Sequence, residues 1–130
     1  MRAHLSGRGV QPEVADRAVA ELTEQGYLDD ERFAGRFAED RRALDHWGTE
    51  RIERRLRELG IERELAAASA AAGEDGELDS AVALLARRFP SPPREERELN
   101  RALGLLVRRG YELELAHDAI RAFGAAERRS

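Results

Sequence analysis

Three adjacent carboxylates, Asp29, Asp30 and Glu31, are the side chains of this sequence best suited by type to metal binding or acid–base chemistry. They lie in the stretch GYLDDERFAGRFA, just before two phenylalanines four residues apart. Adjacent residues of a helix do not face each other, so Asp29 and Asp30 are poorly placed to act as a pair. Asp29 stands where a helix N-cap is expected, and the following acids suit the positive end of the helix dipole. The stretch therefore predicts the beginning of a helix, with Asp29 in a structural role.

The other side chains that could support catalysis or metal binding lack suitable neighbours. His4, His46 and His117 are scattered without the spacing of a zinc site, and each is expected at the surface. No serine lies in a nucleophile elbow, and no glycine-rich segment carries the Lys-Ser/Thr pair of a phosphate loop. The sequence therefore predicts a protein that is not an enzyme and that has no cofactor or metal.

The composition is that of a helical protein with a large charged surface. Hydrophobic residues make up 42% of the 130 residues, and charged residues 37%. Cysteine is absent, which excludes disulfides and thiolate metal sites and favours a reducing, cytoplasmic location. No apolar run approaches the roughly 20 residues needed to span a bilayer, so no membrane association is expected.

The charge is mildly polarised along the chain. The formal net charge of −4 disfavours a protein whose main work is to coat nucleic acid. Residues 27–78 hold 14 acids and 9 arginines, whereas residues 79–130 hold 8 acids and 10 arginines. The C-terminal part is therefore expected to supply more of any attraction to an anionic partner.

A repeat of about fifty residues organises the chain. The segments LSGRGVQPEV, LRELGIEREL and LVRRGYELEL share a leucine, a glycine four residues later and an apolar residue directly after it. Their glycines, Gly9, Gly60 and Gly110, are 51 and 50 residues apart. Glycine at this place is typical of the left-handed position that ends a helix. The pattern predicts that each glycine joins two helices by a tight turn.

The apolar spacing adds a further helix to each unit, and no segment alternates like a strand. We therefore expect an all-α protein of tandem three-helix repeats in an elongated, curved array. The predicted units are a partial first repeat at 1–26 with only its second and third helices, a second repeat at 27–76, and a third repeat at 77–130 with a short tail. Gly26, Gly73 and Gly124 are expected to end the third helix of each repeat.

The apolar residues also predict which helix faces are buried. In the segment from Asp30 to Leu44, the expected face carries Phe33, Phe37 and Leu44. The tryptophan, Trp47, lies in the turn before the next helix and is expected to pack over the junction between the two helices, with an exposed anchor for a partner as the alternative. In the helix after that turn, the expected face carries Ile52, Leu56 and Leu59. Three further faces are expected at Val14, Ala18 and Leu22, at Leu65, Ala68 and Ala72, and at Leu115, Ala119 and Phe123.

Four arginine doublets lie near the C-terminal halves of the predicted helices. For any one doublet, pairing with neighbouring glutamates and with the helix dipole is the favoured interpretation. Together they could dock an acidic protein face or nucleic-acid phosphates. The leading candidates for partner binding are Arg87, Arg88, Arg108 and Arg109, followed by Arg54 and Arg55.

The motifs GYLDDERFAGRFAEDRR, WGTERIERRLRELGI and LVRRGYELELAHDAI resemble the RecX family of bacterial recombination regulators, over nearly the whole chain from Ala3 to Phe123. The resemblance implies curved tandem three-helix repeats, in agreement with the pattern above. It also implies a non-enzymatic modulator of RecA that lodges in the groove of the RecA–single-stranded DNA filament. Such proteins limit filament growth, ATP hydrolysis and strand exchange, and weak direct DNA binding occurs among them. Members usually carry a complete first repeat, whereas this sequence is expected to hold only the second and third helices of that repeat.

Two other functions remain open from the residues. A three-helix unit can resemble a helix-turn-helix module, which would make the chain a direct DNA binder. The negative charge, the very short glycine turn and the lack of a basic arm argue against that function. The third possibility is a helical-repeat scaffold for another partner.

Overall fold

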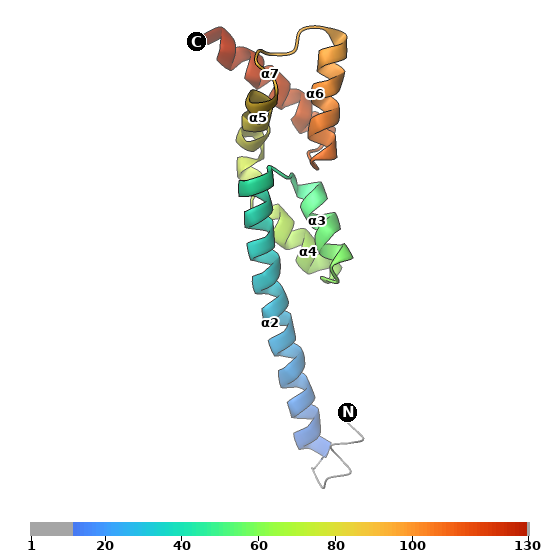
Figure 1. Cartoon of the computed structure of the whole chain (residues 1–130). Coiled ribbons are helices and arrows are strands. Elements are labelled where there is room, and N and C mark those ends of the chain that lie inside the picture. The colour runs from blue at the N-terminus through green and yellow to red at the C-terminus, as the bar shows by residue number, and fades with distance from the viewer. Residues whose placement is uncertain (1–11, 130) are drawn as a thin grey trace. The chain divides into compact units, whose positions relative to one another are not determined.

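In the computed structural model, residues 12–129 are described, and they form helices joined by turns, with no strand among them (Figure 1). The all-α prediction is therefore confirmed for this part of the chain. The chain divides into two compact units, with the boundary after Phe33. The helices, numbered as in Figure 1, are α2 (Pro12–Asp45), α3 (Thr49–Glu58), α4 (Arg63–Ala71), α5 (Glu77–Arg88), α6 (Glu96–Arg108) and α7 (Leu113–Arg129), with a 3-10 turn at Glu74–Gly76.

Helix α2 is continuous where the sequence predicts a turn. It passes through Gly26 and Asp29, so the prediction that a helix ends at Gly26 and that Asp29 caps the next one was wrong. Asp29 instead accepts a hydrogen bond from Gln25 Nε2 at 3.2 Å and lies 3.6 Å from Arg32, both ordinary neighbours along a helix. A glycine in a helix costs only about 1 kcal/mol, and no proline follows to enforce a break. The boundary predicted between residues 26 and 27 therefore falls inside α2.

The buried face of α2 differs from the predicted one. Ala34 and Ala38 are buried, whereas Phe33 and Leu44 are 44% and 67% exposed and Phe37 is half-buried. In the first compact unit, Leu22 is likewise 64% exposed. Small alanine side chains let the helix backbone approach its neighbours closely, so burial here follows size as well as hydrophobicity.

Two hydrophobic clusters fill the second unit. The first joins Ala34 and Ala38 to Ile52, Leu56, Ile61, Leu65, Ala66 and Ala70 from α3, α4 and the turn between them. The second lies among α5, α6 and α7 and contains Leu85, Ala102, Leu106, Tyr111, Ala116, Ala119 and Phe123, among others. Each cluster is a three-helix core of the predicted kind.

The glycine turns in the two repeats confirm the prediction for Gly60 and Gly110. Their φ angles are +94° and +97°. Each turn has the same two bonds, from Gly60 N to Arg57 O and from Ile61 N to Leu56 O in one repeat, both 3.0 Å long. In the other repeat, the Gly110 and Tyr111 amides donate in the same pattern. This is a Schellman motif, and the residue after the glycine is buried in both repeats. Gly9 lies outside the described residues.

Some details of the other helices differ from expectation. Helix α7 continues past Gly124, which the sequence predicts as its end. Ala68 and Ala72 are exposed, while the neighbouring Ala66 and Ala70 are buried. Leu59 is 43% exposed. In α3 and α4, the buried positions therefore differ by a residue or two from those expected, but the same helices pack together.

Candidate partner-binding surface

The C-terminal end of helix α6 lies against the N-terminal end of α3, and backbone groups at the two ends form hydrogen bonds with each other. The amide of Gly48 donates to the Arg109 carbonyl at 2.7 Å, and the amide of Glu50 donates to the Gly110 carbonyl at 3.1 Å. Both glycines are required by space: a Cβ at Gly48 would lie 2.5 Å from the Gly110 oxygen, and one at Gly110 would lie 2.4 Å from Arg51 Cβ. The carbonyls that end α6 thus pair with the amides that open α3, with the helix dipoles aligned head to tail.

A tyrosine in the turn before α7 adds hydrogen bonds at the same junction. The Tyr111 hydroxyl donates to the His46 carbonyl at 2.7 Å and lies 3.0 Å from Ser80 Oγ. His46 has a φ of +54°, is half-buried, and places Nδ1 3.2 Å from the same serine. The prediction of a surface histidine was therefore wrong at this position. Burial raises the pKa of the Tyr111 phenol, and the hydrogen bond with Ser80 offsets part of that rise.

A buried carboxylate links the two repeats on another side. Glu77, only 6% exposed, accepts hydrogen bonds from the backbone amide and the hydroxyl of Thr49 and lies 3.4 Å from Arg42. Arg42 also donates to the Ala70 carbonyl. This network has a structural role, because its charges are paired with one another and are largely withdrawn from solvent.

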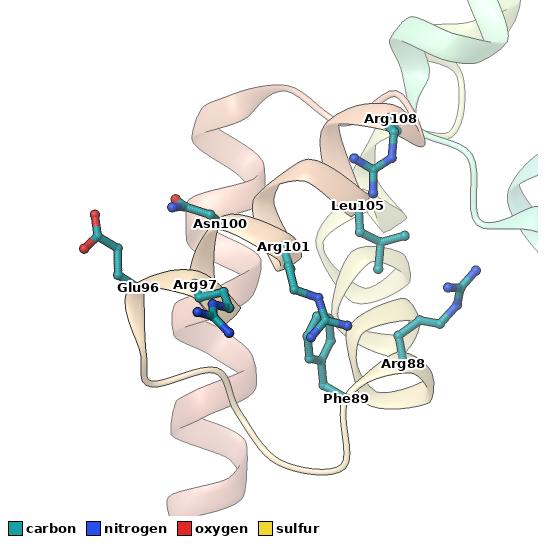
Figure 2. A pocket seen from close by; sticks show the side chains of 8 residues that line it. All are labelled: Arg88, Phe89, Glu96, Arg97, Asn100, Arg101, Leu105 and Arg108. Carbon is teal, nitrogen blue, oxygen red and sulfur yellow. The ribbon is translucent and has the colours of Figure 1, made fainter.

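The arginine-rich surface lies on the third repeat. A groove of about 710 Å³ runs between the end of α5 and the exposed side of α6, and we call it the α6 groove. Figure 2 shows Arg101 lying over Phe89, and its guanidinium carbon is 5.7 Å from the ring centroid. Four arginines and one glutamate give the lining a net positive charge. The lining residues are Arg88, Phe89, Glu96, Arg97, Asn100, Arg101, Leu105 and Arg108.

Helical spacing explains how α6 presents these arginines. Arg97, Arg101 and Arg108 are separated by four and seven residues, which places them along one side of the helix. The other side buries Ala102 and Leu106 in the core. At Gly104 an added Cβ would lie 3.0 Å from Arg108 Nη1, so the glycine leaves room for that side chain to lie back along the helix.

The equivalent face of α3 carries a smaller hollow of about 240 Å³, which we call the α3 hollow. Here Arg51 lies over Trp47, with its guanidinium carbon 4.1 Å from the ring centroid. Trp47 packs on the neighbouring core and edge-on to Phe37, at a centroid distance of 6.1 Å, as expected of a junction residue. Arg51 also donates to the Arg108 carbonyl at 3.2 Å, so the two arginine faces meet at that contact. The lining residues are Trp47, Arg51, Arg54, Arg55 and Glu58.

A third hollow, of about 750 Å³, borders α3 and is acidic. Five glutamates outnumber two arginines in its lining, so it repels the anions that the α6 groove attracts. Its lining residues are Thr49, Glu50, Glu53, Arg54, Arg57, Glu58, Glu74 and Glu112.

The predicted arginines are divided among different surroundings. Arg88 and Arg108 line the α6 groove, and Arg54 and Arg55 line the α3 hollow. Two others have contacts within the chain.

Arg87 Nη1 lies 3.2 Å from His46 Nε2, and the half-buried Arg109 donates to the Asp45 carbonyl. The residues that sequence reasoning missed are Arg97 and Arg101. Their spacing of four residues on a predicted helix was the available signal, which a search for adjacent doublets overlooks.

Among the described residues, no group of three or more histidine, cysteine or acidic side chains is arranged to hold a metal ion. No helix in that part of the chain is long and apolar enough to cross a membrane.

Comparison with known proteins identifies the family. The model of the second three-helix domain of RecX matches residues 29–69, which run from within α2 into α4. The chain is 36% identical over 109 residues to a protein of Xanthomonas axonopodis pv. citri named regulatory protein RecX, covering 83% of this chain and 67% of that protein.

Two further relatives bear the same name. One, from Trichlorobacter lovleyi, is 32% identical over 120 residues, covering 88% of this chain and 78% of the relative. The other, from Mycolicibacterium smegmatis, is 30% identical over 135 residues, covering 98% and 72%. Because these relatives are at least 30% identical over most of this chain, the chain belongs to the RecX family of regulatory proteins.

Proposed function

We propose that this chain is a non-enzymatic cytoplasmic regulator that binds RecA and its filament on single-stranded DNA. Binding limits filament growth, ATP hydrolysis and strand exchange. The observation that carries this proposal is the similarity to regulatory RecX proteins across most of the chain, including both three-helix cores.

The α6 groove supports a role in docking. Its four arginines are exposed, and they outnumber the single glutamate of the lining. Exposed charges of this kind mainly accelerate encounter and set register, and salt screens them over about 8–10 Å. Inhibition of RecA is therefore expected to weaken as ionic strength rises.

Direct DNA binding is the second candidate function, and the arginine row on α6 favours it. Three features weigh against it as the main activity. The net charge of the chain is −4, and the glutamate-rich hollow borders the neighbouring helix α3. The aromatic ring in the groove, Phe89, is only 8% exposed, so it offers little surface on which a base could stack. Weak binding to phosphates remains compatible with the arginines.

The test is the rate of ATP hydrolysis by RecA on single-stranded DNA as this protein is titrated in. We expect the rate to fall progressively, and filaments seen by electron microscopy to shorten. Affinity for single-stranded DNA alone, measured across salt with and without RecA and ATP, separates the two candidates. Unchanged hydrolysis at concentrations that saturate the DNA would contradict regulation of RecA and favour the DNA binder.

A further inference from the structure

We propose that the α6 groove binds an acidic peptide segment in which carboxylates flank one large apolar side chain. The inference deepens the proposed function, because it rests on that function for the assignment of the segment to the regulated partner. The binding chemistry itself follows from the groove.

The charge of the groove is uncompensated within the described residues. No ion pair among them involves Arg88, Arg97, Arg101 or Arg108, and Glu96 is the acid in the lining. Figure 2 shows Glu96 at the opposite edge of the groove from Arg88. Guanidinium groups pair with carboxylates through two parallel hydrogen bonds, which supply direction as well as attraction. An occupant with several carboxylates fits this lining.

The floor of the groove is apolar. Phe89 and Leu105 pack on the core of the third repeat, and Leu105 remains partly exposed. Arg101 places its guanidinium over the Phe89 ring, so the partly exposed Leu105 supplies the open apolar surface of the floor. Asn100 adds an amide that can both donate to and accept from a peptide backbone. One large apolar side chain of the occupant can therefore be covered between the arginines.

The same features disfavour a nucleic-acid strand as the occupant. Single-strand binding sites combine a basic groove with exposed aromatic rings on which bases stack. In the α6 groove, Phe89 is only 8% exposed, and the Arg101 guanidinium lies over its ring. Carboxylates can form paired hydrogen bonds with the arginine guanidinium groups without any aromatic ring to stack on.

Comparison with the second repeat shows that this groove is not a simple consequence of the repeat. Counting back fifty residues from Leu105 and Arg108 leads to Arg55 and Glu58. Those two residues form an ion pair of 3.2 Å, so a charged pair replaces the leucine floor and the terminal arginine. The α3 hollow is accordingly about 240 Å³, against about 710 Å³ for the α6 groove.

The test is fluorescence anisotropy with the full chain and a short labelled peptide in which glutamates and aspartates flank one phenylalanine. Matched peptides carry glutamine and asparagine in place of the acids, or serine in place of the phenylalanine. A labelled oligothymidine is the nucleic-acid probe. The protein variant is Arg97→Glu with Arg101→Glu, and the matched control is Arg57→Glu with Arg63→Glu, which makes the same charge change outside the groove. Circular dichroism checks that each variant is folded, and Arg97→Gln with Arg101→Gln replaces the reversal if it is not.

We expect the acidic peptide to bind, and both matched peptides to bind several-fold more weakly. The groove reversal should weaken peptide binding about tenfold, while the control changes it less than about twofold. Peptide affinity that is insensitive to the groove variants, or that tolerates serine in place of phenylalanine, overturns the proposal. A loss of oligothymidine binding as large as the loss of peptide binding also overturns it, because the groove would then be a phosphate site. None of these readouts uses RecA, so failure here is distinguishable from failure of the proposed function.

Discussion

Helices α3 and α6 occupy equivalent places in successive repeats, yet they share their buried positions and differ on their exposed faces. Ile52 and Ala102, fifty residues apart, are both fully buried, as are Leu56 and Leu106. On the exposed side, Glu58 corresponds to Arg108 and changes the sign of the charge. A three-helix unit needs its apolar contacts and its glycine turn to fold, whereas exposed positions can change at little cost. The repeat therefore preserves a core and allows each copy its own surface.

The two glycine turns also differ in their surroundings. An added Cβ at Gly60 would meet nothing within 4 Å, whereas at Gly110 it would meet the backbone of Arg51. The difference arises because the second turn is also the place where α6 meets α3. The turn at Gly110 therefore joins two helices of the third repeat and also contacts the second repeat.

The largest expected effect is that of Gly110→Ala. We expect it to lower the free energy of unfolding by about 3 kcal/mol or more, since the strained φ is combined with a clash against backbone. Gly60→Ala, which meets only the strain of the left-handed angle, should lose about 1–2 kcal/mol. Urea denaturation of both variants measures the difference. Equal losses would mean that the junction adapts, and that the contact with Arg51 is not rigid.

Removal of the tyrosine hydroxyl is expected to have the next largest effect. Tyr111→Phe makes the turn resemble that of the second repeat, where apolar Ile61 holds the equivalent place. We expect a loss of about 2 kcal/mol, because the His46 carbonyl and Ser80 lose their partner. Ile61→Val, a change of similar size without a polar group, should cost about 1 kcal/mol. Thermal unfolding of both variants provides the comparison.

The same hydroxyl predicts a dependence of stability on alkaline pH. Burial raises the pKa of Tyr111 above the ordinary value of 10.0. Above that ordinary value the unfolded chain loses the phenol proton while the folded chain keeps it, so the free energy of unfolding falls as pH rises. We expect the parent to lose stability more steeply than Tyr111→Phe at pH above about 10. Parallel denaturation curves for the two proteins in that range would contradict the assignment.

The two arginine faces should contribute unequally to regulation. Neutralising the α6 groove with Arg97→Gln and Arg101→Gln is expected to raise the concentration needed to inhibit RecA about fivefold, or roughly 1 kcal/mol. Arg54→Gln with Arg55→Gln should raise it less than about twofold, because Arg55 is already paired with Glu58. Titrations of ATP hydrolysis at low and moderate salt compare the pairs. A larger effect from the Arg54 and Arg55 substitutions would indicate that the docking face lies on the second repeat.

The smallest expected effect is that of Asp29→Ala. Asp29 lies inside α2 with an exposed side chain, and alanine is the better helix former, so the change in unfolding free energy should stay within about 0.5 kcal/mol. Replacing a helix N-cap residue by alanine typically lowers the free energy of unfolding by about 1 kcal/mol. A loss of that size in thermal unfolding would therefore indicate that a helix begins at Asp29 in solution.

Local patterns in the sequence predicted much of the third repeat correctly. The three helices expected in the third repeat at 77–130 correspond to α5, α6 and α7, and the tight turn expected at Gly110 joins α6 to α7. Their ends are marked by prolines and by Gly110, residues whose backbone preferences act without any partner. The turn predicted at Gly26 failed because glycine alone permits a turn but does not impose one.

The sequence by itself determined the helical class, the positive-φ glycine turns and the family, because each depends on residues close together in the chain. The tertiary structure decided which arginines are available to a partner. Arg109 is held by the carbonyl of Asp45, which lies 64 residues away, and Arg87 lies against His46. Arg97 and Arg101 gain their importance only because α5 ends beside them with Arg88 and Phe89. Helical periodicity reports the face on which a side chain lies, but the neighbours of that face are set by contacts between distant segments.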